Sequence, residues 1–220
     1  MSGARALAFD FNGTLSDDEP LLFAIFSQLF AELGRPLSSE EYLEHLVGLS
    51  DPEIVRIWLG EDHPERETVL AERVSRYRTT AADGSTVRPE VREAVLYAAE
   101  HVPVAVVSGA LRAEVEPVLA AAGLSEAVVA VVTAEDVQRG KPDPECYLRA
   151  LALVDGGVRA EDVTAFEDTE AGVAAAKAAG MRCVAVLGTL APERLALADE
   201  LAPALNLAAV RRALGESPPG

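Results

Sequence analysis

Four stretches of this 220-residue chain combine an apolar run, or a turn rich in glycine and proline, with side chains that can do chemistry. In chain order they are residues 9–15, 105–109, 139–144 and 165–172. They offer, respectively, the carboxylate of Asp10, the hydroxyl of Ser108, the ammonium of Lys141 and the adjacent carboxylates Glu167 and Asp168. A nucleophilic carboxylate, donors for an anion and a pair of metal ligands are the groups that phosphoryl chemistry requires.

Each of these stretches also has an ordinary structural interpretation. A lone aspartate that ends a strand, such as Asp10, is most often a turn or cap residue. Ser108 fits a helix cap, Lys141 a solvated surface lysine, and Asp168 the N-terminus of the following helix. Four such sites in one chain make coincidence the weaker explanation, so we favour the chemical interpretation.

The acidic pair and the lysine are charged groups, and each is expected to lie near an opposite charge or a metal ion. Adjacent carboxylates at a buried strand end repel unless a cation holds them, and Mg²⁺ prefers oxygen ligands. Glu167 and Asp168 are therefore candidate magnesium ligands. Lys141 is one of only two lysines, Lys177 being the other, in a chain that otherwise uses arginine. A compact point charge is favoured at position 141. A phosphate oxygen could accept hydrogen bonds from Ser108 and nearby backbone N–H groups.

The elements that must position these side chains follow from apolar patterning. Short apolar runs without strict alternation predict strands buried on both faces, at residues 6–9, 102–107, 128–132, 163–166 and 183–187. Helical patterns lie between them at residues 89–100, 112–122, 144–153 and 170–179. The alternation of strand and helix predicts an α/β fold with a doubly wound, Rossmann-like parallel sheet.

Residues 16–82 carry only helical patterns, for example the apolar face of Leu22, Phe26 and Phe30. We expect a small all-helical domain at 16–82, inserted after the first strand, and a core made of residues 1–15 plus 83–220. Ligands of doubly wound sheets bind at the carboxyl ends of the strands. The insert is therefore expected to act as a lid over that edge.

Composition excludes several classes of function. A formal net charge of -17 argues against binding to nucleic acid or to an anionic membrane. Residues 1–10 lack the apolar stretch of a signal peptide, and no apolar run approaches membrane-spanning length. Cys146 and Cys183 are far apart and are expected to be reduced thiols. We expect a soluble cytoplasmic protein, in which an anionic substrate would need a local cation such as Lys141.

With these motifs, the sequence resembles the haloacid dehalogenase superfamily, in its phosphatase and phosphomutase branch with a small helical cap. The resemblance covers essentially the whole chain. It rests on four motifs, each weak alone and specific together: residues 10–15, Ser108-Gly109, residues 140–144, and Glu167-Asp168 with Gly172.

The resemblance implies a role for each matching residue. Asp10 would form an aspartyl-phosphate, with Asn12 and Lys141 as the other catalytic positions. The phosphate would be bound by Thr14, Ser108, Gly109 and Lys141. Mg²⁺ would be held by Asp10, the backbone carbonyl of Asn12, Glu167 and Asp168. The expected substrate is a small phosphorylated metabolite, and the expected state a monomer or weak dimer.

Asn12 departs from the family pattern, which has an aspartate that protonates the leaving oxygen and activates water. An amide cannot transfer that proton, and such catalysis contributes roughly 10²–10⁴-fold. We therefore expect intact phosphate and magnesium binding with slow turnover. Three explanations are open. Another group supplies the proton, with Asp17, Asp18, Glu19 and His45 as candidates; the sequence is an engineered trap; or Asn12, which precedes Gly13, deamidates to aspartate.

Other branches of the superfamily fit less well. A phosphonate-cleaving relative needs a cap lysine, and residues 16–82 contain none. A dehalogenase would not need the acidic pair. In β-phosphoglucomutase-like proteins an arginine follows the cap serine, but Asp51 follows Ser50 here, which weakens the mutase interpretation unless Arg35 or Arg56 substitutes.

Two functions of other classes remain. A phospho-ligand sensor or regulatory protein would keep the fold and the metal and lose turnover through Asn12. A serine hydrolase using Ser108 is weaker, because the stretch lacks the first glycine of G-x-S-x-G. His101 is expected to pack before the strand, and His45 and His63 are expected to be surface residues.

Overall fold

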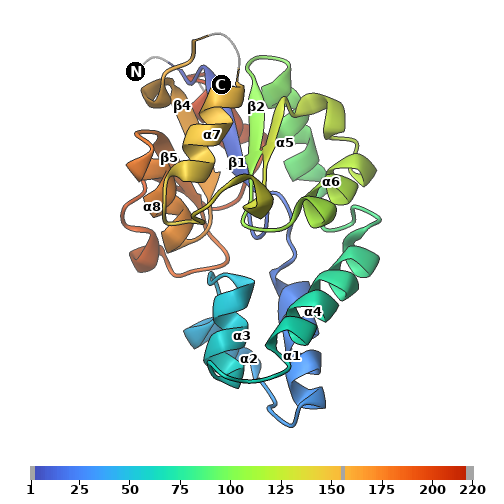
Figure 1. Ribbon diagram of the computed structural model, residues 1–220. Coiled ribbons are helices and arrows are strands. Elements are labelled where there is room, and N and C mark those ends of the chain that lie inside the picture. The colour runs from blue at the N-terminus through green and yellow to red at the C-terminus, as the bar shows by residue number, and fades with distance from the viewer. Residues whose placement is uncertain (1–2, 155–156, 217–220) are drawn as a thin grey trace.

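The computed structural model describes residues 3–154 and 157–216 of the chain (Figure 1). Six parallel strands form one sheet in the order β3-β2-β1-β4-β5-β6. The strands are β1 (Ala6–Asp10), β2 (Val104–Val107), β3 (Ala130–Val132), β4 (Val163–Glu167), β5 (Arg182–Val186) and β6 (Glu200–Ala202). The predicted α/β fold with a doubly wound parallel sheet is confirmed.

Helices connect these strands and form a second group after β1. They are α1 (Glu19–Glu32), α2 (Ser39–His45), α3 (Asp51–Leu59), α4 (Arg66–Ala81), α5 (Pro89–Ala99), α6 (Arg112–Ala121), α7 (Glu145–Leu153), α8 (Glu170–Ala178) and α9 (Leu207–Ala213). Short 3₁₀ turns occur at Ser125–Ala127, Ala134–Asp136, Ala160–Asp162 and Pro192–Leu195.

β1 lies at the centre of the sheet, and its apolar side chains are therefore buried on both faces. It pairs with β2 on one side, where Asp10 is opposite Val107, and with β4 on the other. The strand order reverses between β1 and β4, which is the switch point where ligands of such sheets bind. The register therefore brings the ends of β1, β2 and β4 together.

Helices α1 to α4 form a lobe beyond the end at which β1 stops (Figure 1). We call α1–α4 the helical lobe. It has its own aromatic contacts, because Phe30 stacks on Phe26 and on Trp58 with ring centroids 5.5 and 6.2 Å apart. Its helix α4 contacts α6 beside the sheet. The assignment of residues 16–82 as a separate domain stays a prediction.

The structure adds detail that the patterning lacked. The strand predicted at 128–132 begins only at Ala130, and β6 was not predicted, because it has three residues and begins with Glu200. Cys146 and Cys183 are separate buried thiols. None of the helices in residues 3–154 and 157–216 is both long and apolar enough to cross a membrane.

Candidate active site

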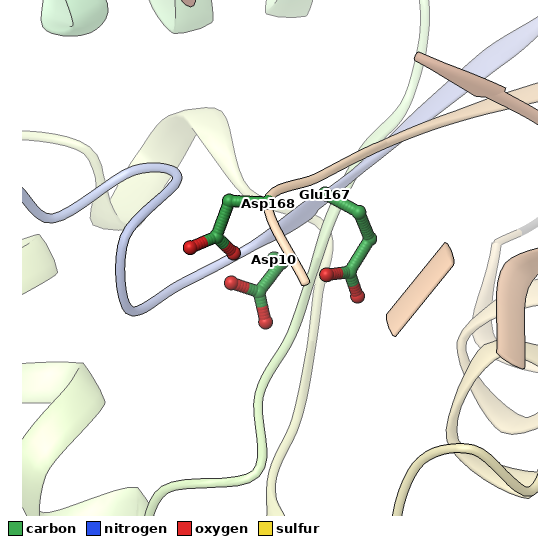
Figure 2. Close-up of side chains that lie close together, drawn as sticks. All are labelled: Asp10, Glu167 and Asp168. Carbon is green, nitrogen blue, oxygen red and sulfur yellow. The ribbon is translucent and has the colours of Figure 1, made fainter. Parts of the chain in front are cut away.

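Three carboxylates from two neighbouring strands converge at the switch point of the sheet (Figure 2). Asp10 is the last residue of β1, Glu167 is the last residue of β4, and Asp168 follows it. One oxygen from each lies within 4.8 Å of the others, and the three residues are 7%, 0% and 1% exposed. This arrangement is consistent with the expectation that the three residues lie together at the carboxyl ends of the strands.

Lys141 supplies positive charge to this cluster from the loop before α7. Its Nζ lies 2.5 Å from Asp10 Oδ1 and 2.6 Å from Glu167 Oε1, and it donates to the Val107 carbonyl at 3.1 Å. Burial alone would lower the pKa of Lys141, but the Asp10 and Glu167 carboxylates outweigh it and raise that pKa. Lys141 is therefore a fixed ammonium in contact with Asp10.

Hydroxyl groups donate hydrogen bonds to the carboxylates of Glu167 and Asp168. Thr14 donates to Asp168 Oδ1 at 3.2 Å and Thr189 to Oδ2 at 2.5 Å, while the Tyr147 hydroxyl donates to Glu167 Oε1 at 2.6 Å. Burial raises the pKa of Asp168, and the negative charge of Asp10 adds to that shift. Burial likewise raises the pKa of Glu167. Three buried carboxylates thus lie beside a single ammonium that contacts only two of them, which leaves an excess of acidic groups.

The donor set suits a hard divalent cation. Glu167 Oε2 is buried and has no hydrogen-bond partner among the described residues. A buried charged oxygen without a partner is costly and indicates a missing ligand. Three converging carboxylates are the oxygen ligands that Mg²⁺ takes in proteins.

Two glycines make room for these carboxylates. A Cβ on Gly13 would lie 2.0 Å from Asp168 Oδ2, and the φ of Gly13 is +74°, a backbone conformation that other residues rarely adopt. A Cβ on Gly172 would lie 1.8 Å from Glu167 Oε2. Both glycines therefore permit a close approach between the backbone and the carboxylates of Asp168 and Glu167.

Asn12 is held by an acidic residue of the following turn. Its Nδ2 donates to Asp18 Oδ2 at 2.8 Å, and Asp18 is fully buried. Among the other proposed proton carriers, Asp17 is exposed, and His45 is exposed at the end of α2 beside Glu44. Glu19 is half-buried, accepts a hydrogen bond from the Tyr42 hydroxyl at 2.6 Å, and has its pKa raised by burial to about 7.

Ser108 and Gly109 follow β2 at the same edge of the sheet. Ser108 is buried, and its Oγ accepts a hydrogen bond from the Ala110 N–H at 3.0 Å. Gly109 is exposed, with open space where a Cβ would lie. His101 instead contacts the Tyr97 carbonyl through Nδ1 at 2.8 Å, and the described hydrogen bonds give Ser108 no histidine partner. The arrangement gives the serine hydrolase interpretation no support.

A cavity of about 370 Å³ lies between the helical lobe and the end of the sheet. Gly13 and Thr189 line it where it approaches the carboxylates, and Thr189 also donates to Asp168. Glu19, Tyr42 and Arg88 line it further out. The cavity therefore adjoins the carboxylate cluster and has both charged and hydroxyl groups on its walls.

Several residues of this region were not among those predicted from the sequence. Tyr147, Thr189 and Tyr42 gave no local signal, because their partners lie 20 or more residues away in the chain. Arg73 did give one, since it shares the fourfold spacing of the buried face of α4 with Tyr77. Arg73 Nε lies 3.0 Å from Asp51.

Arg35 and Arg56, the two arginines that the sequence analysis considered as substitutes near Asp51, do not lie beside it. Arg56 is half-exposed and pairs with Glu61 at 3.8 Å, and Arg35 is exposed. The buried guanidinium next to Asp51 is that of Arg73.

Comparison with known proteins identifies the family to which this chain belongs. Residues 7–186 match the family model described as haloacid dehalogenase-like hydrolase. The chain is 30% identical over 199 residues to validoxylamine A 7'-phosphate phosphatase of Streptomyces hygroscopicus subsp. limoneus, covering 90% of this chain and 92% of that one. It is 31% identical over 185 residues to hexitol phosphatase B of Escherichia coli strain K12, covering 82% of each.

Solved structures show the same architecture. CbbY from Rhodobacter sphaeroides in complex with phosphate superposes with a TM-score of 0.80 at 28% identity, covering 92% of this chain and 95% of that one. A mutant of CbbY in complex with xylulose-(1,5)bisphosphate gives 0.79 at 29% identity, with the same coverage. A β-phosphoglucomutase from Clostridium difficile, 18% identical with a TM-score of 0.79 over 96% of this chain and 97% of that one, supports the fold. By its family match, its phosphatase relatives and its fold, this chain belongs to the haloacid dehalogenase-like hydrolases.

Proposed function

We propose that the chain is a magnesium-dependent phosphatase that removes phosphate from a small phosphate monoester through an aspartyl-phosphate on Asp10. The observation that carries this proposal is the buried contact of Asp10 with Lys141, beside the carboxylates Glu167 and Asp168. A nucleophilic carboxylate beside a fixed ammonium and a set of metal ligands is suited to phosphoryl transfer.

In this mechanism a carboxylate oxygen of Asp10 attacks phosphorus while the bond to the substrate's ester oxygen breaks, and the leaving alkoxide takes a proton from solvent water. Water then attacks the phosphorus of the aspartyl-phosphate, which releases phosphate and restores Asp10. Lys141 lies 2.5 Å from Asp10 and would hold phosphoryl oxygens together with Ser108 and the backbone N–H of Gly109. Thr14, predicted as a phosphate ligand, is proposed instead to orient Asp168, to which it donates.

Asp10, Glu167, Asp168 and the backbone carbonyl of Asn12 are the proposed Mg²⁺ ligands. The unpaired Glu167 Oε2 and the excess of buried acidic groups support this assignment. The bound metal would supply neutralisation of charge between an anionic nucleophile and an anionic substrate.

The cavity beside the cluster is the proposed site for the alcohol part of the substrate. The pair formed by Glu19 and the Tyr42 hydroxyl can exchange hydrogen bonds with substrate hydroxyls, and Arg88 adds donors. Carboxylates on these walls, including Asp17, disfavour a second phosphate. We therefore propose a monophosphate of a polyol or sugar, in line with the hexitol phosphatase among the relatives. The helical lobe would act as the cap over this site.

A second candidate is a phospho-ligand-binding protein that does not turn over, and Asn12 favours it. An asparagine at this position cannot carry the proton that a leaving alcohol needs. In that case the chain would bind phosphate in the presence of magnesium and release no product.

The experiment is phosphate release from a panel of polyol and sugar monophosphates, with magnesium or with EDTA, by the natural chain and by Asp10→Asn. Asp62→Asn, an exposed aspartate of the helical lobe, is the matched control. We expect metal-dependent release that Asp10→Asn abolishes and Asp62→Asn retains. Equal release by Asp10→Asn would overturn the proposal, and metal-dependent phosphate binding without release would favour the second candidate.

A further inference from the structure

We propose that Asp18 is the positioning residue for the side chain of Asn12. The two residues form a matched pair of amide and carboxylate. Asn12 is therefore more than the replacement of a catalytic aspartate by an inactive residue. This inference rests on the proposed phosphatase function. It assigns a role to a residue outside the four family motifs. It also explains why an asparagine is suited to position 12 in this chain.

The surroundings of Asp18 contain donors directed at both of its carboxylate oxygens. Oδ2 accepts from Asn12 Nδ2 at 2.8 Å and from the Tyr77 hydroxyl at 2.5 Å, and Oδ1 accepts from the Gly13 N–H at 3.2 Å. The residue is 0% exposed. No cation pairs with Asp18 among the ion pairs of the described residues. A carboxylate with three donors and no cation is built to accept hydrogen bonds.

This contact fixes which way the Asn12 amide faces. Because Nδ2 is used by Asp18, the carbonyl oxygen Oδ1 on the same planar group faces away from Asp18. Asn12 is only half-buried, so Oδ1 is the side-chain atom available to a ligand. It can accept a hydrogen bond from the attacking water or the leaving alcohol and hold it in line, although it cannot take its proton.

The same contact makes aspartate unsuitable at position 12 in this chain. An aspartate there would place a second carboxylate about 3 Å from buried Asp18, and like charges that close disfavour each other. With asparagine, the contact is a hydrogen bond instead. The residue types at positions 12 and 18 therefore depend on each other.

Tyr77 connects this pair to the helical lobe. Tyr77 is fully buried on α4, and the Arg73 guanidinium lies 5.2 Å from its ring centroid. Arg73 in turn forms a buried ion pair with Glu114 of α6. The position of Asp18, and hence of Asn12, therefore depends on how the lobe is seated on the core.

The test is a swap of the two residue types. The variants are Asn12→Asp, Asp18→Asn and the double variant carrying both, with Asp62→Asn as an exposed control. For each we would measure kcat and KM with the best monophosphate of the panel, the rate of aspartyl-phosphate hydrolysis in single turnover, and the melting temperature.

We expect Asp18→Asn to lower kcat about tenfold or more with little change in KM, because the amide of Asn12 loses its orientation. Asn12→Asp should melt several degrees below the natural chain, because its new carboxylate faces Asp18. The double variant should recover that stability. Its turnover should exceed that of either single variant by at least about tenfold, since acid-base catalysis can then operate beside an amide.

Unchanged kcat in Asp18→Asn, together with additive effects in the double variant, would overturn the inference. The melting temperatures keep it testable if no variant turns over. Strong coupling of the two positions in stability without any phosphate release would retain the pair and reject the phosphatase function. Phosphate release with no coupling in either measurement would retain the phosphatase function and reject the pair.

Discussion

Lys141 is the cation that contacts the buried carboxylates of the candidate site. Its ammonium contacts both Asp10 and Glu167 and lies 5.5 Å from the centroid of the Tyr147 ring. No other described cation lies within ion-pair distance of these two carboxylates. Removing it leaves two buried carboxylates facing each other, in a chain whose net charge is already -17.

We expect Lys141→Gln to lower kcat by about 10²–10³-fold, the range for removal of a preorganised charge next to the reacting group. Lys141→Arg should not restore activity, because a planar guanidinium does not replace a compact ammonium in a fitted site. Steady-state kinetics with magnesium present measure both variants. Lys177→Gln, which removes the other lysine of the chain, is the control and should stay near the natural rate. A Lys141→Gln protein with natural kinetics would contradict this role.

Glu19 determines a pH dependence of stability. Burial raises its pKa from 4.5 to about 7, while the Tyr42 hydroxyl acts in the opposite direction. The charges that face it are Asp18 and Asp51, which raise this pKa further, and Arg73, which lowers it. Between about pH 4.5 and 7 the folded protein keeps a proton that the unfolded chain has lost. Glu19 therefore favours the folded state at low pH, and this preference is lost as pH rises to 7.

We expect Glu19→Gln to stabilise the protein at pH 8 relative to the natural chain, on the order of 2 kcal/mol after allowance for partial exposure, and to have little effect at pH 4.5. Urea unfolding at both pH values measures the difference. Glu93→Gln on the exposed face of α5 is the control. A stability difference that does not change with pH would show that the pKa of Glu19 is not raised by folding.

At the scale of elements, one buried ion pair joins the helical lobe to the core. Arg73 of α4 contacts Glu114 in the first turn of α6, and both residues are 2% exposed. Arg73 Nε also lies 3.0 Å from Asp51 at the start of α3. Removing one member of a buried pair leaves a charge without its partner, which is strongly destabilising.

We therefore expect Glu114→Gln to lower the free energy of unfolding by about 3 kcal/mol, the lower end of the range for such pairs because Asp51 still faces Arg73. Glu116→Gln on the same helix is the matched control. Glu116 is half-exposed and pairs with Arg112 at 2.8 Å, so its loss should cost under about 1 kcal/mol. Equal effects of the two substitutions in urea unfolding would show that the Arg73 contact does not hold the lobe.

The strands and the site motifs were predictable from sequence for a local reason. A strand buried on both faces reads as a continuous apolar run, so the positions of Asp10 and Glu167 at strand ends follow directly from patterning. β6 lacked that signal, since it is a three-residue edge strand that includes Glu200 and the exposed Leu201. Short edge strands carry too few buried residues to be recognised in this way.

The contacts between distant segments were not predictable. Tyr77 and Asp18 are 59 residues apart, and their hydrogen bond depends on how α4 packs on the first turn of the chain after β1. The role of Arg73 was likewise hidden, although its place on the apolar stripe of α4 marks a buried charge that needs partners. Local patterns predict elements and strand-end chemistry, whereas tertiary packing decides which side chains from other elements support them.

At the scale of the whole molecule, the fold brings two kinds of structure to one edge of a sheet. The switch point between β1 and β4 supplies the carboxylates, the loop before α7 adds Lys141, and the helical lobe adds Glu19 and Tyr42 on the wall of the cavity. A strongly acidic protein that acts on an anionic substrate must concentrate its positive charge locally. Lys141 and the proposed divalent cation would supply that charge here.

The central claim is that Asp10 becomes phosphorylated during turnover. The most direct measurement is rapid acid quenching of the natural chain with its best monophosphate and magnesium, followed by peptide mass mapping. We predict the mass of one phosphoryl group on the peptide containing Asp10, in a protein whose Asn12 is unmodified, and its absence when magnesium is removed. Turnover in which quenched protein never carries phosphate on that peptide would contradict the account.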